Sequence, residues 1–198
     1  MTNKFQNKFR IPSTRLQNWD YCWAGAYFIT ICTKNREHYF GEIENGEMRL
    51  SEIGRIAEQE WIKTFDMRPD MNIQMGEFVV MPNHFHAIII IGENEYNHKN
   101  QRNDDVRCTD ARCTDAMHCV STTNNIKNRF GPQSKNLASI IRGFKIGVTT
   151  HARKIDPDFA WQRLFHDHII RDGQSFKRIQ TYINENSTKW VDDMFSNF

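Results

Sequence analysis

The amino-acid sequence predicts an α+β fold in which an antiparallel β-sheet carries helices on one face and one further helix follows. Three observations lead to this prediction. Short segments rich in aromatic and β-branched residues alternate with longer segments of helical periodicity. Two of the short segments, residues 71–82 and 84–91, are separated only by a turn signal. The length of 198 residues suits one domain of moderate size.

The first half of the chain contains a strand, a hairpin and a helix. Tyr27–Thr33 (YFITICT) is rich in aromatic and β-branched residues and is expected to form a strand. Asn45-Gly46 lies between short apolar-bearing segments and predicts a hairpin turn. Ser51 is expected to cap the N-terminus of a helix over residues 51–65, because apolar residues then recur near the helical period.

Two adjacent strands and a second helix follow. Residues 71–82 and 84–91 are expected to pair as an antiparallel hairpin around Pro82-Asn83. Pro82 would stand at the end of the first of these strands, where its missing N–H costs least. Leu137–Ile155 returns to helical spacing.

The chain closes with a strand and a helix. Trp161–Asp172 is a strand candidate, and Ser175 is expected to cap a final helix that runs on toward Trp190. When the small hairpin is set aside, the order of elements is βαββαβ plus a C-terminal helix. This order is that of the ferredoxin-like arrangement, with helices on one face of an antiparallel sheet.

Residues 93–135 differ in character from the rest of the chain. They are polar, short of aliphatic residues, and contain the pentapeptide RCTDA twice in tandem over residues 107–116. We predict a polar, disordered insertion at about residues 93–135 within a single domain over residues 1–198. Three cysteines and a histidine cluster in this segment: Cys108, Cys113, His118 and Cys119. Their spacing is wider than the C-x2-4-C pairs usual in structural zinc sites, which disfavours zinc binding.

Composition narrows the class of protein only moderately. The formal net charge is +2, but residues 137–182 contain eight Lys or Arg against four Asp. The excess of positive charge over residues 137–182 is compatible with a polyanion partner. Charged residues on solvent-exposed helix faces explain the same excess nearly as well. No apolar run approaches the roughly 20 residues needed to cross a bilayer, and no secretory signal opens the chain. With an odd number of cysteines, five, we expect a reduced, cytoplasmic protein without membrane association.

The stretch HFHAIIII at residues 84–91 places two histidines at the start of a predicted strand. His84 and His86 are at positions i and i+2, so their side chains share one face with Cα atoms about 6.5–7 Å apart. Two imidazoles so placed can bind one divalent metal, provided that a further ligand completes the site. Paired histidines on a strand can equally be solvated surface residues.

The last predicted helix offers a ligand and a nucleophile. Tyr182 and Asn186 are at i and i+4, which would place them on one helix face, one turn apart. An amide oxygen is a suitable ligand for Mg²⁺ or Mn²⁺. A tyrosine hydroxyl can act as a nucleophile if a metal polarises the electrophile. Taken alone, Tyr182 is more simply an ordinary residue of an amphipathic helix.

A second His-x-His sequence, His166-Asp167-His168, lies on the last predicted strand. It competes with the first pair for the metal role. Asp167 would point away from the two histidines, so the opposite face is not cleanly apolar at that position. We therefore favour structural or surface roles for His166 and His168.

These segments together resemble the REP-associated tyrosine transposases, which are single-tyrosine HUH transposases (histidine, bulky hydrophobic, histidine). The resemblance covers nearly the whole chain apart from residues 93–135. It rests on the order of six segments: STRLQNWDY, YFITICTKNREHYFG, VVMPNHFHAIIII, IIRGFK, WQRLFHDHIIRD and YINENSTKW. The implied fold is the same ferredoxin-like arrangement.

The resemblance implies a transposase that cleaves and rejoins single-stranded, hairpin-forming DNA through a 5′-phosphotyrosyl intermediate. Tyr182 matches the position of the catalytic tyrosine. His84, His86 and Asn186 match the positions of ligands for Mg²⁺ or Mn²⁺. One departure is that Ser187 follows Asn186, where the family usually has proline.

Binding of single-stranded DNA usually relies on basic residues and on aromatic stacking. The residues expected to contact DNA are Arg142, Lys145, Trp161, Arg163 and Arg171. For Trp161 a place in the core is at least as plausible. An alternative function is a catalytically silent hairpin DNA-binding protein of the same fold, and a third is a replication initiator or relaxase. Either a monomer or a homodimer is compatible with the sequence.

Overall fold

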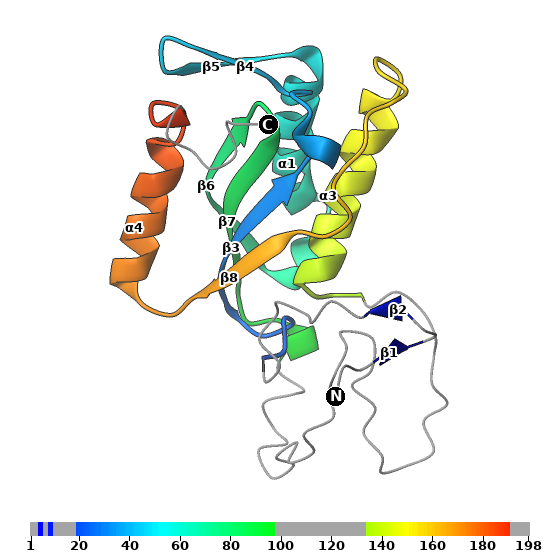
Figure 1. Cartoon of the computed structure of the whole chain (residues 1–198). Coiled ribbons are helices and arrows are strands. Elements are labelled where there is room, and N and C mark those ends of the chain that lie inside the picture. Colours follow the sequence, from blue (N-terminus) through cyan, green and yellow to red (C-terminus); the bar gives the residue numbers. More distant parts are fainter. Residues whose placement is uncertain (1–3, 6–7, 10–18, 98–133, 191–198) are drawn as a thin grey trace.

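A four-stranded antiparallel sheet forms the centre of the computed structural model, which describes residues 4–5, 8–9, 19–97 and 134–190 (Figure 1). The strands stand in the order β6-β7-β3-β8. Their bounds are β3 Gly25–Cys32, β6 Ile73–Met81, β7 His84–Ile91 and β8 His166–Ile170. The first strand therefore lies between the third and the fourth, as in a βαββαβ fold, and the predicted fold class is confirmed.

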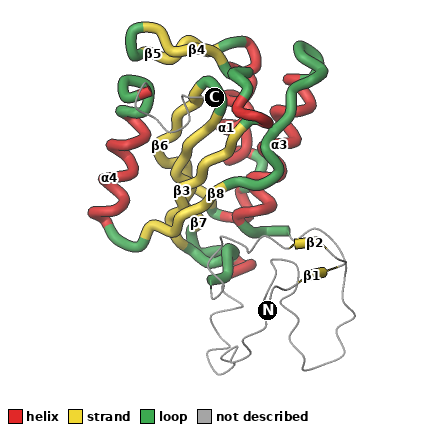
Figure 2. Tube along the Cα trace, viewed as in Figure 1, coloured by secondary structure: helices red, strands yellow, loops and turns green. Residues whose placement is uncertain are grey.

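In the described part of the chain, helices and two small hairpins accompany this sheet (Figure 2). The helices are α1 Glu52–Asp66, α3 Leu137–Ala152 and α4 Gly173–Asn184, with short 3-10 turns η1 Lys34–Arg36 and η2 Pro69–Met71. The hairpins pair β1 Lys4–Phe5 with β2 Lys8–Phe9, and β4 Gly41–Glu44 with β5 Glu47–Leu50. Helices α1 and α3 lie on one side of the sheet and α4 lies on the other (Figure 1).

Strand β7 is apolar along nearly its whole length because both of its faces are covered. Side chains alternate between faces along a strand. Phe85 points toward α1 and α3, where its ring lies 5.1 Å from the rings of Trp61 and Phe144. Ile88 points the other way and packs with Ile183 of α4. A strand buried on both faces reads as a continuous apolar run, which explains the sequence HFHAIIII.

Local signals in the first half of the chain produced the elements that they predict. Asn45 and Gly46 connect β4 to β5 with φ angles of 54° and 80°, as a type I′ hairpin turn requires. The hydroxyl of Ser51 accepts a hydrogen bond from Gly54 N at 3.0 Å, so Ser51 is the N-cap of α1. The predicted strand, hairpin and first helix are therefore confirmed.

The predicted ends of the last helix were wrong. Its N-cap is Asp172, whose Oδ1 accepts from Ser175 N at 2.8 Å, so Ser175 lies inside the first turn. Either side chain is a good N-cap, and the end of β8 at Ile170 leaves Asp172 at the right place. Helix α4 ends at Asn184, well before Trp190.

The last strand is also shorter than the sequence suggests. The ladder with β3 covers His166–Ile170, and Trp161 forms only an isolated bridge to Thr33. Trp161 packs beneath the strand instead of extending it, because its ring joins the aromatic core described below.

Part of the predicted insertion belongs to the packed body. Asn94 and Asn97 are buried, and their side-chain amides donate to Met71 O and Gly92 O, both at 2.9 Å. The RCTDA repeat and its cysteines lie outside the described residues. No helix among the residues that the structure describes is long and apolar enough to cross a membrane. The cytoplasmic location and the oligomeric state stay predictions.

Candidate functional site

His84 and His86 lie on the face of β7 that α4 covers. Their ring centroids are 4.5 Å apart, and the residues are 0% and 1% exposed. In the ladder, His86 stands opposite Thr30 and His84 opposite Cys32 of β3. The strand positions of the two imidazoles therefore agree with the prediction from their i, i+2 spacing.

Three neighbours from other elements surround the His86 ring. Its Nδ1 lies 2.8 Å from Thr30 Oγ1, and its Nε2 lies 3.2 Å from the hydroxyl of Tyr182. The Phe28 ring stacks on it with a centroid distance of 5.2 Å. An Nδ1–H that donates toward β3 leaves the Nε2 lone pair to accept from Tyr182. Strand β3 thus orients the ring, and helix α4 brings the tyrosine to it.

His84 is held by a residue next to it in the chain. Its Nδ1 lies 2.9 Å from Oδ1 of Asn83, which is itself buried. A hydrogen bond from Nδ1–H to this amide oxygen places the lone pair on Nε2, the form that a metal requires. The Trp190 ring stacks on His84 at 5.9 Å with an angle of 27° between the planes.

Both imidazoles are neutral at neutral pH. Burial lowers the pKa of His86 to about 3, although a hydrogen bond with the backbone of Ile29 acts in the opposite direction. Burial also lowers the pKa of His84 well below its usual range, and the charges of His86 and Arg36 add to this effect. Neutral imidazole is the form that coordinates metal ions.

Tyr182 lies on α4, and Asn186 lies in the turn that follows this helix. Tyr182 is 42% exposed, so its hydroxyl reaches His86 from a position open to solvent. Asn186 lies beyond the end of α4, in a turn where its N–H donates to Ile183 O at 3.3 Å. The two residues are therefore not on one helix, as their spacing suggested. The turn continues to Trp190, which contacts His84.

The residues present fit a small divalent cation by their chemistry. Asn186 is 3% exposed, and its Oδ1 is buried and accepts no hydrogen bond from the described part of the chain. A buried acceptor without a donor suggests a missing partner such as a cation. Among the described residues no three His, Cys, Asp or Glu side chains converge on a metal position. A metal here would rest on His84, His86 and the Asn186 amide.

Two of the residues predicted to bind DNA, Trp161 and Lys145, are partly buried and make structural contacts. The Trp161 ring packs between Phe40 and Phe144 at 5.3 and 5.9 Å, and its Nε1 donates to Lys145 O at 3.2 Å. The ammonium of Lys145 donates to the carbonyls of Gln162 and Leu164. Burial lowers the pKa of Lys145 to about 8. These contacts give both residues structural roles, and whether they also contact DNA stays a prediction.

The three predicted arginines are not gathered around Tyr182. Arg142 lies on α3, which covers the opposite face of the sheet, and is partly buried. Arg163 and Arg171 are exposed and stand just before and just after β8. Of these three arginines, only Arg163 and Arg171 flank a strand that borders the site.

Sequence reasoning missed four residues that shape the site. They are Phe28, Thr30, Asn83 and Trp190. Asn83 could have been noticed, because it immediately precedes His84. Phe28 and Thr30 could not, because their contact with His86 depends on the register between two strands far apart in sequence.

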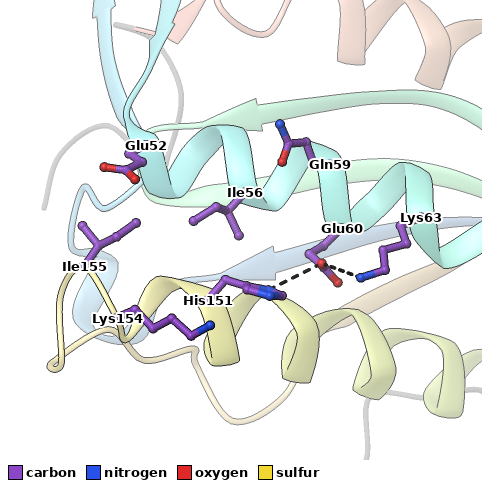
Figure 3. A pocket seen from close by; sticks show the side chains of 8 residues that line it. All are labelled: Glu52, Ile56, Gln59, Glu60, Lys63, His151, Lys154 and Ile155. Atoms are coloured by element: carbon purple, nitrogen blue, oxygen red, sulfur yellow. Dashed lines mark hydrogen bonds and ion pairs between the residues drawn. The ribbon is translucent and has the colours of Figure 1, made fainter.

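A pocket of about 330 Å³ lies elsewhere, between α1 and α3 (Figure 3). In it the buried carboxylate of Glu60 lies 3.3 Å from the Lys63 ammonium and 3.5 Å from Nδ1 of His151. The pocket is on the helix-covered side of the sheet and contains neither Tyr182 nor the histidine pair. The pairing of Glu60 with Lys63 and His151 favours a structural role for this carboxylate.

No known family model matches this chain. An uncharacterized protein of Haemophilus influenzae is 37% identical over 182 residues, a match that covers 91% of this chain and 90% of that protein. The structure of a REP-associated tyrosine transposase bound to a REP hairpin is similar with a TM-score of 0.55 and 18% identity. That similarity covers 91% of this chain and 74% of the transposase. At this identity the likeness shows a shared fold.

Proposed function

Because this chain belongs to the same protein family as the Haemophilus influenzae protein and has the fold of a REP-associated tyrosine transposase, we propose that it is a transposase of the HUH type. In this proposal it cleaves and rejoins single-stranded, hairpin-forming DNA in the course of DNA transposition and recombination. It does so as a metal-dependent endonuclease and ligase.

One observation carries this proposal. The hydroxyl of Tyr182 lies 3.2 Å from Nε2 of His86, although the two residues are separated by 96 positions in the chain. This contact places a candidate nucleophile beside the two histidines that could hold a metal, so a phosphate polarised there would lie within its reach. The fold brings a partly exposed tyrosine to a buried pair of neutral histidines, and an ordinary surface helix would have no need of this contact.

The residues have separate tasks in the proposed reaction. His84, His86 and Asn186 would hold Mg²⁺ or Mn²⁺, which when bound polarises the scissile phosphate. The Tyr182 oxygen attacks the phosphorus and loses its proton to solvent. The bond to the 3′-oxygen breaks, and that oxygen takes up a proton and leaves as a 3′-OH. The 5′-phosphotyrosyl link conserves the energy of the phosphodiester bond, so rejoining needs no ATP.

The hydrogen bond between Tyr182 and His86 competes with metal binding at His86. Nε2 of neutral His86 has one lone pair, which cannot both accept from the tyrosine and coordinate a metal. If His86 Nε2 held a metal ion, the Tyr182 hydroxyl would lose this hydrogen bond. The tyrosine would then be free to attack a phosphate that the metal polarises.

Covalent trapping tests the proposal. Labelled single-stranded oligonucleotides from the DNA that flanks this gene are incubated with the protein and Mg²⁺ or Mn²⁺, then separated on a denaturing protein gel. A labelled adduct is expected for the wild type and not for Tyr182→Phe. An adduct that persists in Tyr182→Phe would assign the nucleophile to another residue and contradict the proposal.

The alternative, a catalytically silent hairpin DNA-binding protein, has one observation in its favour. The Trp190 ring stacks on His84, and both histidines are buried, so the site is closed to a phosphate as it stands. Tight hairpin binding without any adduct, under all metal conditions tried, would favour this alternative.

A further inference from the structure

The second His-x-His sequence lies on the same face of the sheet as the first. In the ladders, Thr30 of β3 stands opposite His86 on one side and opposite His166 on the other. Directly opposed residues point to the same face of a sheet. His86, Thr30 and His166 therefore form one row across three strands, on the face that bears Tyr182.

A second row runs beside the first. Phe28 stands opposite Ile88 of β7 and opposite His168 of β8. The Phe28 ring contacts both His86, at 5.2 Å, and Tyr182, at 6.1 Å. His168 is thus one strand away from a ring that touches the nucleophile. The site continues over β3 to the edge strand.

The two histidine pairs differ in burial. His84 and His86 are enclosed, whereas His166 and His168 are exposed. Strand β8 is the last strand of the sheet, so only one of its edges is paired. An enclosed pair suits an ion, and an exposed pair beside it suits a larger ligand that approaches from solvent.

The charge around the exposed pair is favourable to an anion. Asp167 stands opposite Ile29, a core residue of the other face, so its carboxylate points away from the two histidines. Arg163 and Arg171 are exposed on either side of the strand.

We propose that His166 and His168 bind the single DNA strand that leads to or from the scissile phosphate at Tyr182. Two strand spacings separate His86 from His166, about 10 Å, so DNA held at the tyrosine can pass over β8. Imidazole N–H groups donate to phosphate oxygens, and the ring offers a face on which a base can stack. This inference rests on the proposed function and assigns it a path for the substrate.

Equilibrium binding tests the inference without requiring cleavage. All variants are made in the full chain with Tyr182→Phe, in EDTA, and the probe is a fluorescein-labelled hairpin with a single-stranded flank on each side. His166→Ala combined with His168→Ala is expected to raise the Kd about tenfold, the effect of losing one or two stacking contacts. A hairpin without flanks is expected to bind both proteins equally.

Two further variants make the result specific. His151→Ala removes a histidine from α3 on the other side of the sheet and is expected to leave the Kd unchanged. His166→Lys combined with His168→Lys keeps donors for phosphate but loses the ring faces, so it is expected to restore only part of the lost binding. Thermal melting of each variant excludes unfolding as the cause, since both histidines are exposed on an edge strand.

The possible outcomes distinguish a failure of the proposed substrate path from a failure of the proposed function. An unchanged Kd for the flanked hairpin in the double alanine variant, or an equal loss in His151→Ala, overturns the substrate path. If the wild type still forms its Tyr182 adduct in that event, the proposed function stands. If the protein with Tyr182→Phe binds neither probe, the proposed function fails and the substrate path fails with it.

Discussion

The two faces of the central sheet are built from different kinds of residue. Toward α1 and α3 the sheet presents a continuous aromatic and aliphatic core, in which Trp61, Phe85 and Phe144 meet at 5.1–5.2 Å. Toward α4 the apolar cluster is small, and histidines, a threonine and a tyrosine occupy the rest. The face toward α1 and α3 supplies most of the packing that stabilises the fold. The face toward α4 has polar side chains that are available for binding or catalysis.

This comparison teaches why polar residues are tolerated in so apolar a strand. Buried polar groups are costly unless hydrogen-bonded. His86 meets Thr30 and Tyr182, and His84 meets Asn83, so each imidazole has partners. Substitutions on the two faces are therefore expected to separate stability from activity, with effects that decrease in the order that follows.

The largest effect on stability is expected on the α1/α3 face. Trp61→Ala removes a fully buried ring and leaves a cavity, which destabilises the protein by about 3–5 kcal/mol. Urea unfolding followed by circular dichroism measures the change. Trp61→Phe is the control and is expected to lose less, because a ring still contacts Phe85. A loss under about 1 kcal/mol for Trp61→Ala would contradict the assignment of this face as the main core.

A smaller loss is expected on the α4 face. Ile183→Ala removes one of four buried residues from a cluster that solvent borders, so the expected cost is about 2 kcal/mol. Because Ile183 docks the helix that carries Tyr182, adduct formation is expected to fall as well. Ile183→Val retains most of the packing and serves as the control. Full activity of Ile183→Ala would mean that helix docking does not position the tyrosine.

The N-cap of α4, Asp172, is expected to contribute less to stability than Ile183 does. Asp172→Ala removes the side chain that accepts from Ser175 N, and its cost is expected to be smaller than that of Ile183→Ala. Asp172→Asn keeps a capping side chain and should recover most of this loss. Ser175→Ala is expected to matter less than Asp172→Ala in the same unfolding experiment. The reverse order would restore Ser175 as the cap that the sequence suggested.

Substitution of Tyr182 is expected to change stability least and the proposed cleavage activity most. Tyr182→Phe is expected to change the unfolding free energy by no more than about 0.5 kcal/mol, since the ring is retained and the side chain is 42% exposed. By removing the hydrogen bond to His86 Nε2, it is expected to tighten Mn²⁺ binding about threefold or more. Isothermal titration calorimetry measures the affinity.

A matched hydroxyl deletion controls for this result. Tyr39→Phe removes a hydroxyl that donates to Asp158 O, away from the histidine pair, and should leave Mn²⁺ affinity unchanged. Weaker Mn²⁺ binding in Tyr182→Phe would show that the tyrosine is itself a ligand. It would also contradict the idea that loading the site frees the nucleophile.

Local sequence signals were sufficient for most of the elements. The Asn45-Gly46 turn needs two left-handed residues, and the Ser51 cap needs only an oxygen near the third residue of the helix. Where two signals competed, as Asp172 and Ser175 did, local reasoning chose the wrong one. The same reasoning ran the last helix past its true end at Asn184, because the sequence after it is still polar and helix-compatible.

The sequence by itself determined the β-strand spacing that puts His84 and His86 on one face, since side chains alternate strictly along a strand. Only the tertiary structure decided that this is the face α4 covers, that Thr30 and Phe28 support the His86 ring, and that the second histidine pair lies on the same side. Those facts depend on register between strands that are distant in the chain. A shift of one residue in either ladder would reverse them, and nothing local to either strand specifies that register.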